Sequence, residues 1–525
     1  MKVLFISPNR EKEPYVAAPL GIAYLSAVLL KEGYNVKVLD LCFEDEPVSA
    51  TKKTLNDFQP DIIGISIRNL ESSTTFLIPT IKDVVDCCKD YGRGKIILGG
   101  TAFSITPEDM LRYFDVDLGI IGEGEESLPE LLRRLSDKKP FDDIAGAAYI
   151  DNKSDFRMNM PWRLQDINRL PMPARHLLPN HLYDMGNIQT KRGCEYSCIY
   201  CTYPFLEGKN VRLRSPVSVA DEMEEMIRKY NIANFYFVDN VFNSPESHAK
   251  EICAEIIKRR LDIQWSALIS PRNFSKELLN LMIDAGCKSV EIGSDAASSV
   301  MLKRLGKNFS VDDIRHAAKM CDEAGLMHMH FLLLGGPGET EETLKETLKN
   351  MEEINPPKVF AVASIRLYPN TPIQRLAEKE GKIKKGESLF YPKFYISDDI
   401  SSRLFKIMDE FIPMHPNWMY FPANAVKMPN EEAEVKTEVK VEKREIIWKK
   451  ETKERFDEII KSVPRILQPI AKRMVNKKAM ENAQKRSSAY VENRDMIAAF
   501  ASETPRPFQS KMREKVIEMG LSEWL

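Results

Sequence analysis

The chain has 525 residues and a mass of 60.1 kDa, with 75 Lys and Arg residues against 77 Asp and Glu residues. The net charge of −2 lacks the basic excess of nucleic-acid-binding proteins, and no run of about 18 apolar residues occurs, so we expect neither a nucleic-acid partner nor a transmembrane helix. Nine cysteines are too few for a disulfide framework in a chain of this length, which favours a reducing, cytoplasmic location.

Residues 1–140 alternate short apolar runs with amphipathic segments, which predicts an α/β domain with a doubly wound, Rossmann-like parallel sheet. The expected strands cover residues 3–7, 36–39, 62–67, 95–98 and 120–121. The expected helices cover residues 21–31, 75–90 and 127–135. Residues 141–186 are irregular and punctuated by proline, which is typical of a connector between domains.

The alternation resumes at residue 187 and predicts a partial (β/α)6 barrel over residues 187–385. The expected strands cover residues 188–191, 234–238, 264–267, 289–292, 328–334 and 359–366. Ser244 and Pro245 fit the N-cap and first position of one helix between them. Parallel barrels carry their chemistry at the carboxyl ends of the strands, where we therefore expect the site.

Three further segments complete the chain. Residues 386–430 are expected to cap the barrel, and residues 431–447, dense in Glu, Lys and Val, to form a charged linker. Apolar residues at helical spacing predict a helical C-terminal domain over residues 448–525.

The strongest functional signal is the cysteine motif RGCEYSCIYC, which follows the first expected barrel strand. Cys194, Cys198 and Cys201 have the spacing C-x3-C-x2-C, and three thiolates on one loop can ligate three irons of a [4Fe–4S] cluster. A structural zinc site would need a fourth ligand, usually from a second C-x2-C pair, and no second pair exists. We interpret the six other cysteines as buried apolar residues.

The motif resembles that of the radical S-adenosylmethionine (SAM) superfamily. The resemblance implies that SAM chelates the fourth iron and is cleaved by one-electron reduction to a 5′-deoxyadenosyl radical, with flavodoxin or ferredoxin as electron donor. It also implies that residues at the ends of successive strands contact SAM. These are Tyr200 near the adenine, Asp239 and Asn240 for the amino group, Ser294 and Asp295 (where Glu is commoner) for the ribose, and Gly335 and Gly336 for the adenine.

Four phrases of the N-terminal domain, PLGIAYLSAVL, IGISIRNLESST, ILGGTAFSITPEDML and GIIGEGEESLPEL, together resemble the cobalamin-binding domain that precedes the barrel in one radical SAM subclass. The resemblance implies cobalamin contacts at the loops after the strands. The candidates are Ser66, Arg68, Asn69, Leu70, Gly99, Gly100, Thr101, Gly122, Glu123, Gly124 and Glu125. None of the seven histidines lies in this domain, and D-x-H-x-x-G is absent. The implied corrinoid is therefore base-off and His-off, with Arg68, Asn69 and Leu70 near its lower face; the alternative is a domain that binds no cobalamin.

Two weaker signals leave alternatives open. His328 and His330 alternate along one expected strand and so share a face, which is either the barrel interior near SAM or a buried polar core. The C-terminal segment weakly resembles the small helical domain of light-independent protochlorophyllide reductase subunits, which would hint at a tetrapyrrole substrate or a partner reductase. The simpler interpretation is a helical bundle that adds stability or mediates pairing.

The resemblances together predict a cobalamin-dependent radical SAM enzyme that methylates an unactivated carbon of a small molecule. The expected substrate is a lipid, a tetrapyrrole or a natural-product intermediate. One alternative is cobalamin-assisted oxidation or cyclisation without methyl transfer. Another is a corrinoid or redox sensor without turnover, which would not need both cofactor motifs.

Overall fold

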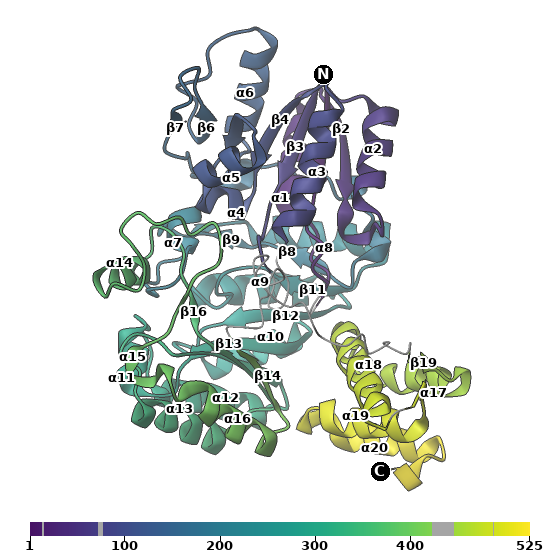
Figure 1. The fold of residues 1–525 in the computed structure, drawn as a ribbon. Helices are drawn as coiled ribbons and strands as arrows, with labels where there is room; N and C mark the ends of the chain where they lie inside the picture. The colour runs from purple at the N-terminus through teal and green to yellow at the C-terminus, as the bar shows by residue number, and fades with distance from the viewer. Residues whose placement is uncertain (13–14, 72–76, 423–445, 487, 525) are drawn as a thin grey trace.

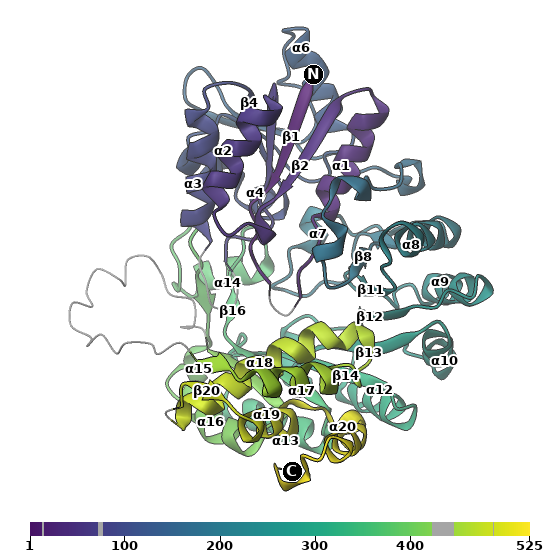
Figure 2. The same ribbon diagram turned by 90° about the vertical axis from the view of Figure 1, so that its right-hand side faces the viewer.

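The computed structural model describes residues 1–12, 15–71, 77–422, 446–486 and 488–524. An N-terminal α/β unit stacks on the mouth of a partial barrel, and the C-terminal helices lie against the barrel (Figures 1 and 2). Among the described helices, none combines the length and the apolarity needed to cross a bilayer.

The N-terminal unit contains a seven-stranded sheet, within the described residues, in the order β2-β1-β3-β4-β5-β6-β7. Pairs among the first five strands are parallel, and β6 and β7 join antiparallel. The strands are β1 (Lys2–Ser7), β2 (Asn35–Asp40), β3 (Ile62–Ser66), β4 (Lys95–Gly99), β5 (Leu118–Ile120), β6 (Ala147–Ile150) and β7 (Phe156–Met158). The interior strand β1 is buried from Val3 to Ser7 because helices cover both faces of the sheet.

Helices on the two faces of this sheet bury two separate apolar clusters, as a doubly wound domain requires. They are α1 (Leu20–Lys31), α2 (Pro47–Phe58), α3 (Ile78–Asp90), α4 (Thr101–Ile105), α5 (Pro107–Phe114) and α6 (Ser127–Ser136). Strand order reverses at β1, and the loops after β1, β3 and β4 meet at the edge that faces the barrel.

The expected connector at residues 141–186 is wrong in its first part, because β6 and β7 extend the N-terminal sheet to Met158. Ala147 and Ala148 are fully buried against the sheet's core, but two alanines followed by a three-residue partner strand give no alternating pattern that the sequence could reveal. The rest of the connector is irregular apart from the 3-10 turns η2 (Ile167–Arg169), η3 (Arg175–Leu177) and η4 (Asn180–Leu182).

The second sheet is parallel, has seven strands among the described residues and curves into an open barrel in the order β18-β15-β14-β13-β12-β11-β8. The strands are β8 (Gly186–Ile188), β11 (Asn234–Phe237), β12 (Gln264–Ile269), β13 (Cys287–Asp295), β14 (Met327–Leu334), β15 (Lys358–Ala363) and β18 (Trp418–Pro422). The prediction of six strands was therefore one short. A Pro-rich aromatic segment concealed β18, which pairs along the whole outer edge of β15.

The expected strand over residues 359–366 is interrupted at Ser364, whose φ of 128° breaks the extended backbone. Beyond it, β16 (Ile365–Arg366) leaves the barrel sheet and pairs with β17 (Phe394–Tyr395). A second small pair, β9 (Lys191–Arg192) with β10 (Arg212–Leu213), precedes and follows the cysteine loop.

The barrel unit contains ten helices among the described residues, most of which cover the outer face of its sheet (Figure 2). They are α7 (Tyr203–Leu206), α8 (Pro216–Tyr230), α9 (Glu246–Lys258), α10 (Lys276–Asp284), α11 (Ser299–Arg304), α12 (Val311–Glu323), α13 (Glu341–Ile354), α14 (Pro372–Lys379), α15 (Asp398–Ser401) and α16 (Leu404–Phe411). The predicted cap of α9 was wrong by one residue. Pro245 takes the N-cap position without a side-chain hydrogen bond, and the Ser244 hydroxyl donates instead to Glu195 at 2.7 Å.

The C-terminal segment is a helical unit with its own apolar core. It contains α17 (Lys450–Ile460), α18 (Gln468–Lys485), α19 (Asn493–Glu503), α20 (Arg506–Glu518) and the strand pair β19 (Ile447–Trp448) and β20 (Tyr490–Val491). It packs on the barrel where the strands begin: Lys358 at the start of β15 pairs with Glu503 at 3.4 Å, and Leu467 joins the barrel's core cluster. Residues 431–445 of the expected linker lie outside the described residues.

Candidate functional site

The three motif cysteines lie on the loop that follows β9. Cys194, Cys198 and Cys201 are all half-buried free thiols. The loop is anchored at its start, where the Cys194 N–H donates to the Gly208 carbonyl at 3.0 Å. The Cys201 N–H donates to the Cys198 carbonyl at 3.2 Å, which turns the last two cysteines back on each other.

The arrangement of the three thiols suits an iron–sulfur cluster better than a single metal ion. Among the described residues, no three His, Cys, Asp or Glu side chains converge on a single metal ion, which disfavours a zinc site. A [4Fe–4S] cubane binds each thiolate at a different iron, so its three ligands need not converge on one point. Burial raises the pKa of the Cys201 thiol to about 12, and iron binding replaces the thiol proton. Three partly exposed thiols on one anchored loop fit a cubane that keeps one iron free of protein ligands.

A lysine that the sequence analysis missed connects the cysteine loop to the end of β13. The Lys307 Nζ lies 2.5 Å from the Asp295 carboxylate, 3.3 Å from the Tyr200 hydroxyl and 3.8 Å from the Cys198 sulfur. The Tyr200 hydroxyl also donates to Asp295. Burial alone would lower the pKa of Lys307, but Asp295 and Cys198 hold it above its ordinary value. Tyr200 and Asp295, two predicted SAM contacts, are thus brought together.

The sequence feature that could have revealed Lys307 is the glycine directly before it, Gly306. This glycine has φ +74°, and a Cβ there would lie 2.6 Å from the Ser197 carbonyl oxygen of the cysteine loop. Only a residue without a side chain allows the two loops to approach so closely. A Leu-Gly-Lys turn shortly after the ribose motif therefore carries a cation to the cluster loop.

Asp239 and Asn240 follow β11 and lie beside the start of the cysteine loop. The buried Asp239 carboxylate accepts hydrogen bonds from the Thr190 N–H at 2.7 Å and from the Thr190 hydroxyl at 2.5 Å. The Asn240 amide donates to Glu207 Oε2 at 2.9 Å. The same Glu207 oxygen accepts from the Gly193 N–H at 2.9 Å. Both candidates therefore hold the cluster loop in place, and contact with SAM stays a prediction.

Ser294 and the two histidines face the helices outside the barrel rather than its interior. The Ser294 hydroxyl lies 2.8 Å from His330 Nδ1, and His330 Nε2 lies 3.1 Å from His328 Nδ1. His328 Nε2 then lies 3.1 Å from Asp322 on α12. All three of the strand side chains in this chain of contacts are fully buried. The interpretation as a satisfied polar core is the one that the geometry supports.

Gly335 and Gly336 form the turn after β14; Gly335 packs against Ile396 and Leu404, and Gly336 packs against Met301 and Leu305. The Gly335 N–H donates to the Glu339 carboxylate. Burial raises the pKa of Glu339 to about 7, although the N–H groups of the two glycines oppose this shift. Glu339 thus fixes the turn, and its second carboxylate oxygen is buried without a described partner.

A cavity of about 670 Å³ separates the N-terminal domain from the barrel mouth. Both domains contribute its wall. Of the predicted cobalamin contacts, those that line it are Ser66, Arg68, Asn69, Gly100, Thr101, Gly122, Glu123, Gly124 and Glu125; the barrel contributes Tyr203, Tyr236, Asp239, Asn240, Leu268 and Glu291, among others. Leu70 does not line the cavity but is buried in the domain's own core. Gly99 ends β4 and is also absent from the cavity wall.

Gly100 shows why the loop after β4 needs glycine. Its φ is +95°, and a Cβ there would lie 2.5 Å from the Ile67 carbonyl oxygen. Glycine adopts such a conformation without steric cost. The loops after β3 and β4 therefore pack closely and leave an open cradle above the barrel for a large, flat ligand.

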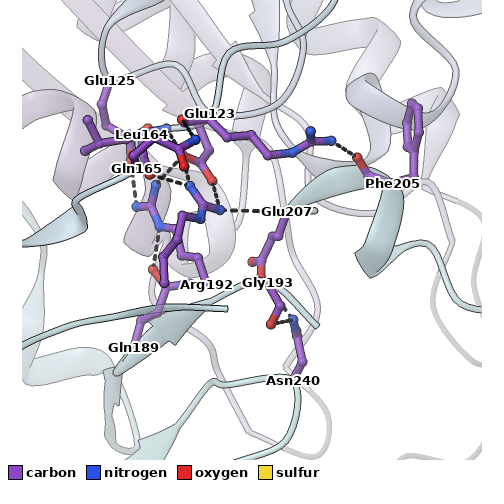
Figure 3. Close-up of polar contacts among 12 residues, drawn as sticks. Glu123, Glu125, Leu164, Gln165, Gln189, Arg192, Gly193, Phe205, Glu207 and Asn240 are labelled. Atoms are coloured by element: carbon purple, nitrogen blue, oxygen red, sulfur yellow. Dashed lines mark hydrogen bonds and ion pairs between the residues drawn. The ribbon is translucent and has the colours of Figure 1, made fainter. Parts of the chain in front are cut away.

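Figure 3 shows how the acidic loop after β5 reaches the barrel. Glu123 forms a two-pronged pair with Arg212, at 2.9 and 2.5 Å, and the Glu125 carboxylate lies 2.6 Å from Arg192. All four side chains are at most 10% exposed. Burial would raise the pKa of Glu125, but Arg192 outweighs it and holds the pKa below its ordinary value. The two predicted cobalamin contacts thus line the cavity, while their carboxylates pair with arginines of the barrel unit across the domain interface.

Comparisons with known families agree with this division of the chain. The family model for the B12 binding domain matches residues 8–132. The family model for the radical SAM superfamily matches residues 188–351. The two matches correspond to the N-terminal sheet and to the barrel, respectively.

Individual proteins resemble the chain over most of its length. An uncharacterized methyltransferase of Pyrococcus horikoshii is 29% identical over 369 residues, which cover 68% of this chain and 78% of the relative. The anaerobic magnesium-protoporphyrin IX monomethyl ester cyclase of Rubrivivax gelatinosus is 25% identical over 413 residues, covering 73% and 70%. The radical SAM methyltransferase TsrM of Kitasatospora setae, solved with cobalamin and a [4Fe–4S] cluster, shares the fold with a TM-score of 0.70 and 22% identity, covering 80% of this chain and 92% of TsrM.

Proposed function

The chain is a cobalamin-dependent radical SAM enzyme, in which a B12-binding domain precedes a radical SAM domain, and from this premise we propose that it methylates an unactivated carbon of a small molecule. When bound, the cluster and SAM supply a 5′-deoxyadenosyl radical, and cobalamin supplies the methyl group. The observation that carries the proposal is the shared cavity, whose wall includes the cobalamin-domain loops and the ends of the barrel strands.

In this proposal the barrel residues bind the cluster and SAM, and the loops of the N-terminal domain bind the corrinoid on the opposite wall of the cavity. Cys194, Cys198 and Cys201 hold the cluster. Asp295 and Lys307 present opposite charges 2.5 Å apart beside the cysteine loop, and these suit hydroxyl donors and a carboxylate of SAM. On the opposite wall, the loops after β3, β4 and β5 cradle the corrinoid with backbone rather than with a histidine.

Arg68 has a particular place in this proposal. It lines the cavity from the loop after β3, on the side where the resemblance puts the lower face of the corrinoid. A guanidinium has no lone pair to offer to a metal, so Arg68 would contact a bound corrinoid without acting as a ligand to cobalt. Such a corrinoid should show no nitrogen coupling from the protein in the electron paramagnetic resonance spectrum of its Co(II) form.

The reaction is tested with SAM that carries a deuterated methyl group. Protein reconstituted anaerobically with iron, sulfide and cobalamin is reduced and incubated with this SAM and cell extract. Methyl transfer to carbon should yield S-adenosylhomocysteine and 5′-deoxyadenosine together, and label should appear in a small molecule of the extract. If 5′-deoxyadenosine formed without S-adenosylhomocysteine, the result would count against methylation.

That second outcome would favour cobalamin-assisted oxidation or cyclisation. The observation in favour of this candidate is the similarity to the anaerobic cyclase of R. gelatinosus over 73% of the chain. Its radical step needs the same cysteine loop and the same shared cavity, but no methyl group leaves SAM. The ratio of the two SAM products therefore separates the two reactions.

A further inference from the structure

We propose that Glu291, held by Tyr236 at the floor of the shared cavity, is the anchoring point of the substrate, and that the group it receives is a protonated amine. The inference rests on the proposed function, because it treats this cavity as the substrate chamber. It adds a substrate class, an amine-bearing small molecule, and a residue that selects it.

Glu291 lies inside the barrel. On β13 it stands in register with Leu268 of β12 and Met329 of β14, so these three side chains share one face of the sheet. Leu268 and Glu291 both line the cavity, together with Tyr236 of β11. The part of Glu291 that stays exposed therefore faces the cavity rather than the outer solvent.

One hydrogen bond positions the carboxylate. The Tyr236 hydroxyl donates to Glu291 Oε2 at 2.7 Å, and the ring of Tyr15 packs against Tyr236 with 5.1 Å between centroids. Burial and the Glu291 charge raise the pKa of Tyr236, so its hydroxyl remains a donor. The second carboxylate oxygen is left to accept a bond from whatever enters the cavity.

Among the described residues, Glu291 forms no ion pair with Lys, Arg or His, and Tyr236 is its one hydrogen-bond donor, whereas each other carboxylate of the cavity wall has an arginine or at least two donors. Glu123 and Glu125 are paired with arginines. Asp239 accepts three hydrogen bonds, and Glu207 accepts two N–H groups. A carboxylate buried without a cation is costly, and burial raises the pKa of Glu291 accordingly. A cation brought by the ligand would remove that cost.

Apolar side chains lie around the carboxylate inside the barrel and close the barrel at the amino ends of the strands. Met329 lies beside Glu291 in the register of the sheet, and the stacked rings of Phe331 and Phe360, with 5.1 Å between centroids, lie two residues further along their strands. The C-terminal helices close the barrel beneath this layer, where an apolar cavity is lined by Met329, Phe360 and residues of 459–512. The ligand must therefore enter from the cobalamin side with its ammonium pointing down.

The test measures direct binding of three isosteric probes to protein loaded with cluster and hydroxocobalamin. The probes are benzylammonium, benzyl alcohol and benzoate, and ligand-observed NMR gives their affinities. We expect benzylammonium to bind at least about tenfold more tightly than benzyl alcohol, the effect of one charge-assisted hydrogen bond, and benzoate not to bind. Glu291→Gln should reduce benzylammonium binding by about tenfold or more and leave benzyl alcohol within about threefold.

The controls keep the test decisive. Glu277→Gln removes the same charge from an exposed position on α10 and should leave all affinities unchanged. Tyr236→Phe keeps the carboxylate and frees Oε2, the oxygen that Tyr236 had bound, so benzylammonium should still bind; this variant also serves if Glu291→Gln fails to take up iron and cobalamin. Equal binding of alcohol and ammonium, or ammonium binding that Glu291→Gln leaves unchanged, would overturn the proposal. The readout needs no SAM cleavage, so the proposed reaction can fail while the anchor is confirmed, and the reverse.

Discussion

Arg192→Met removes the cation that joins the cysteine loop to the B12-binding domain. Arg192 stands two residues before Cys194 and pairs with Glu125 at 2.6 Å. Arg192 also lies 3.5 Å from Glu123, but Arg212 binds both carboxylate oxygens of Glu123. Of the two glutamates, the variant therefore deprives only Glu125 of its paired cation. Methionine keeps most of the apolar stem, and the variant loses the charge together with the hydrogen bond from Arg192 to Gln189 at 3.0 Å.

The expected loss of stability follows from the burial of the Glu125 carboxylate. The Glu125 side chain is 7% exposed, and removal of one partner of a buried ion pair costs about 3–5 kcal/mol. At roughly 2–4 °C per kcal/mol for a domain of this size, the thermal midpoint should fall by roughly 6–20 °C. Adding Glu125→Gln removes the uncompensated charge, and the double variant should recover at least about half of the loss.

Thermal unfolding of the apo protein, followed by circular dichroism, measures these midpoints. Arg133→Met breaks a surface pair of 2.5 Å with Glu130 and should change the midpoint by less than about 2 °C. The pKa of Glu125 is lowered in the folded state, so its contribution is present above the ordinary value of about 4.3 and is lost as pH falls below it. The double variant should lack this acid-dependent loss. If Arg192→Met unfolded like the wild type, the domain interface would not depend on this network.

Three further predictions concern the cofactor sites. Cys198→Ala should lower bound iron well below the about four atoms per chain of a complete cluster and abolish reductive SAM cleavage, measured as 5′-deoxyadenosine. Gly100→Ala should cost about 1–3 kcal/mol or more in unfolding experiments and lower cobalamin occupancy, because φ is +95° and the Cβ meets backbone; normal occupancy would contradict the cradle. Lys307→Met should weaken SAM binding about tenfold in equilibrium dialysis, since Asp295 loses its cation, whereas Lys303→Met on the surface should not.

The sequence predicted what repeats along the chain or depends on spacing. The two α/β units follow from alternating apolar runs, and the cysteine loop follows from C-x3-C-x2-C. Strand β18 could not be predicted, because it follows Pro416, ends in Pro422 and is ordered by its pairing with β15. β6 and β7 were missed for the same reason, since a short edge strand is stabilised by the sheet that it joins rather than by its own pattern.

The residues of the candidate site were likewise predictable only in part. Asp295 and Tyr200 were predicted from motif order, and they do come together, but the lysine that completes the group lies 107 residues from Tyr200 and has no motif of its own. Ser294 was assigned to SAM from its place beside Asp295. The register of β13 shifts between Ile292 and Asp295, and the Ser294 side chain is buried against His330 on the outer face of the sheet. Glu123 and Glu125 were read as ligand contacts, because a sequence cannot show that Arg192 and Arg212 already occupy their carboxylates.

The central claim is that one chain holds both cofactors at once. Iron, sulfide and cobalt are measured in a single sample of the wild-type protein, reconstituted anaerobically and desalted, and the corrinoid absorbance of the same sample is recorded. The account predicts about four iron, about four sulfide and about one cobalt per chain. Iron without cobalt, or zinc in place of iron, would contradict it.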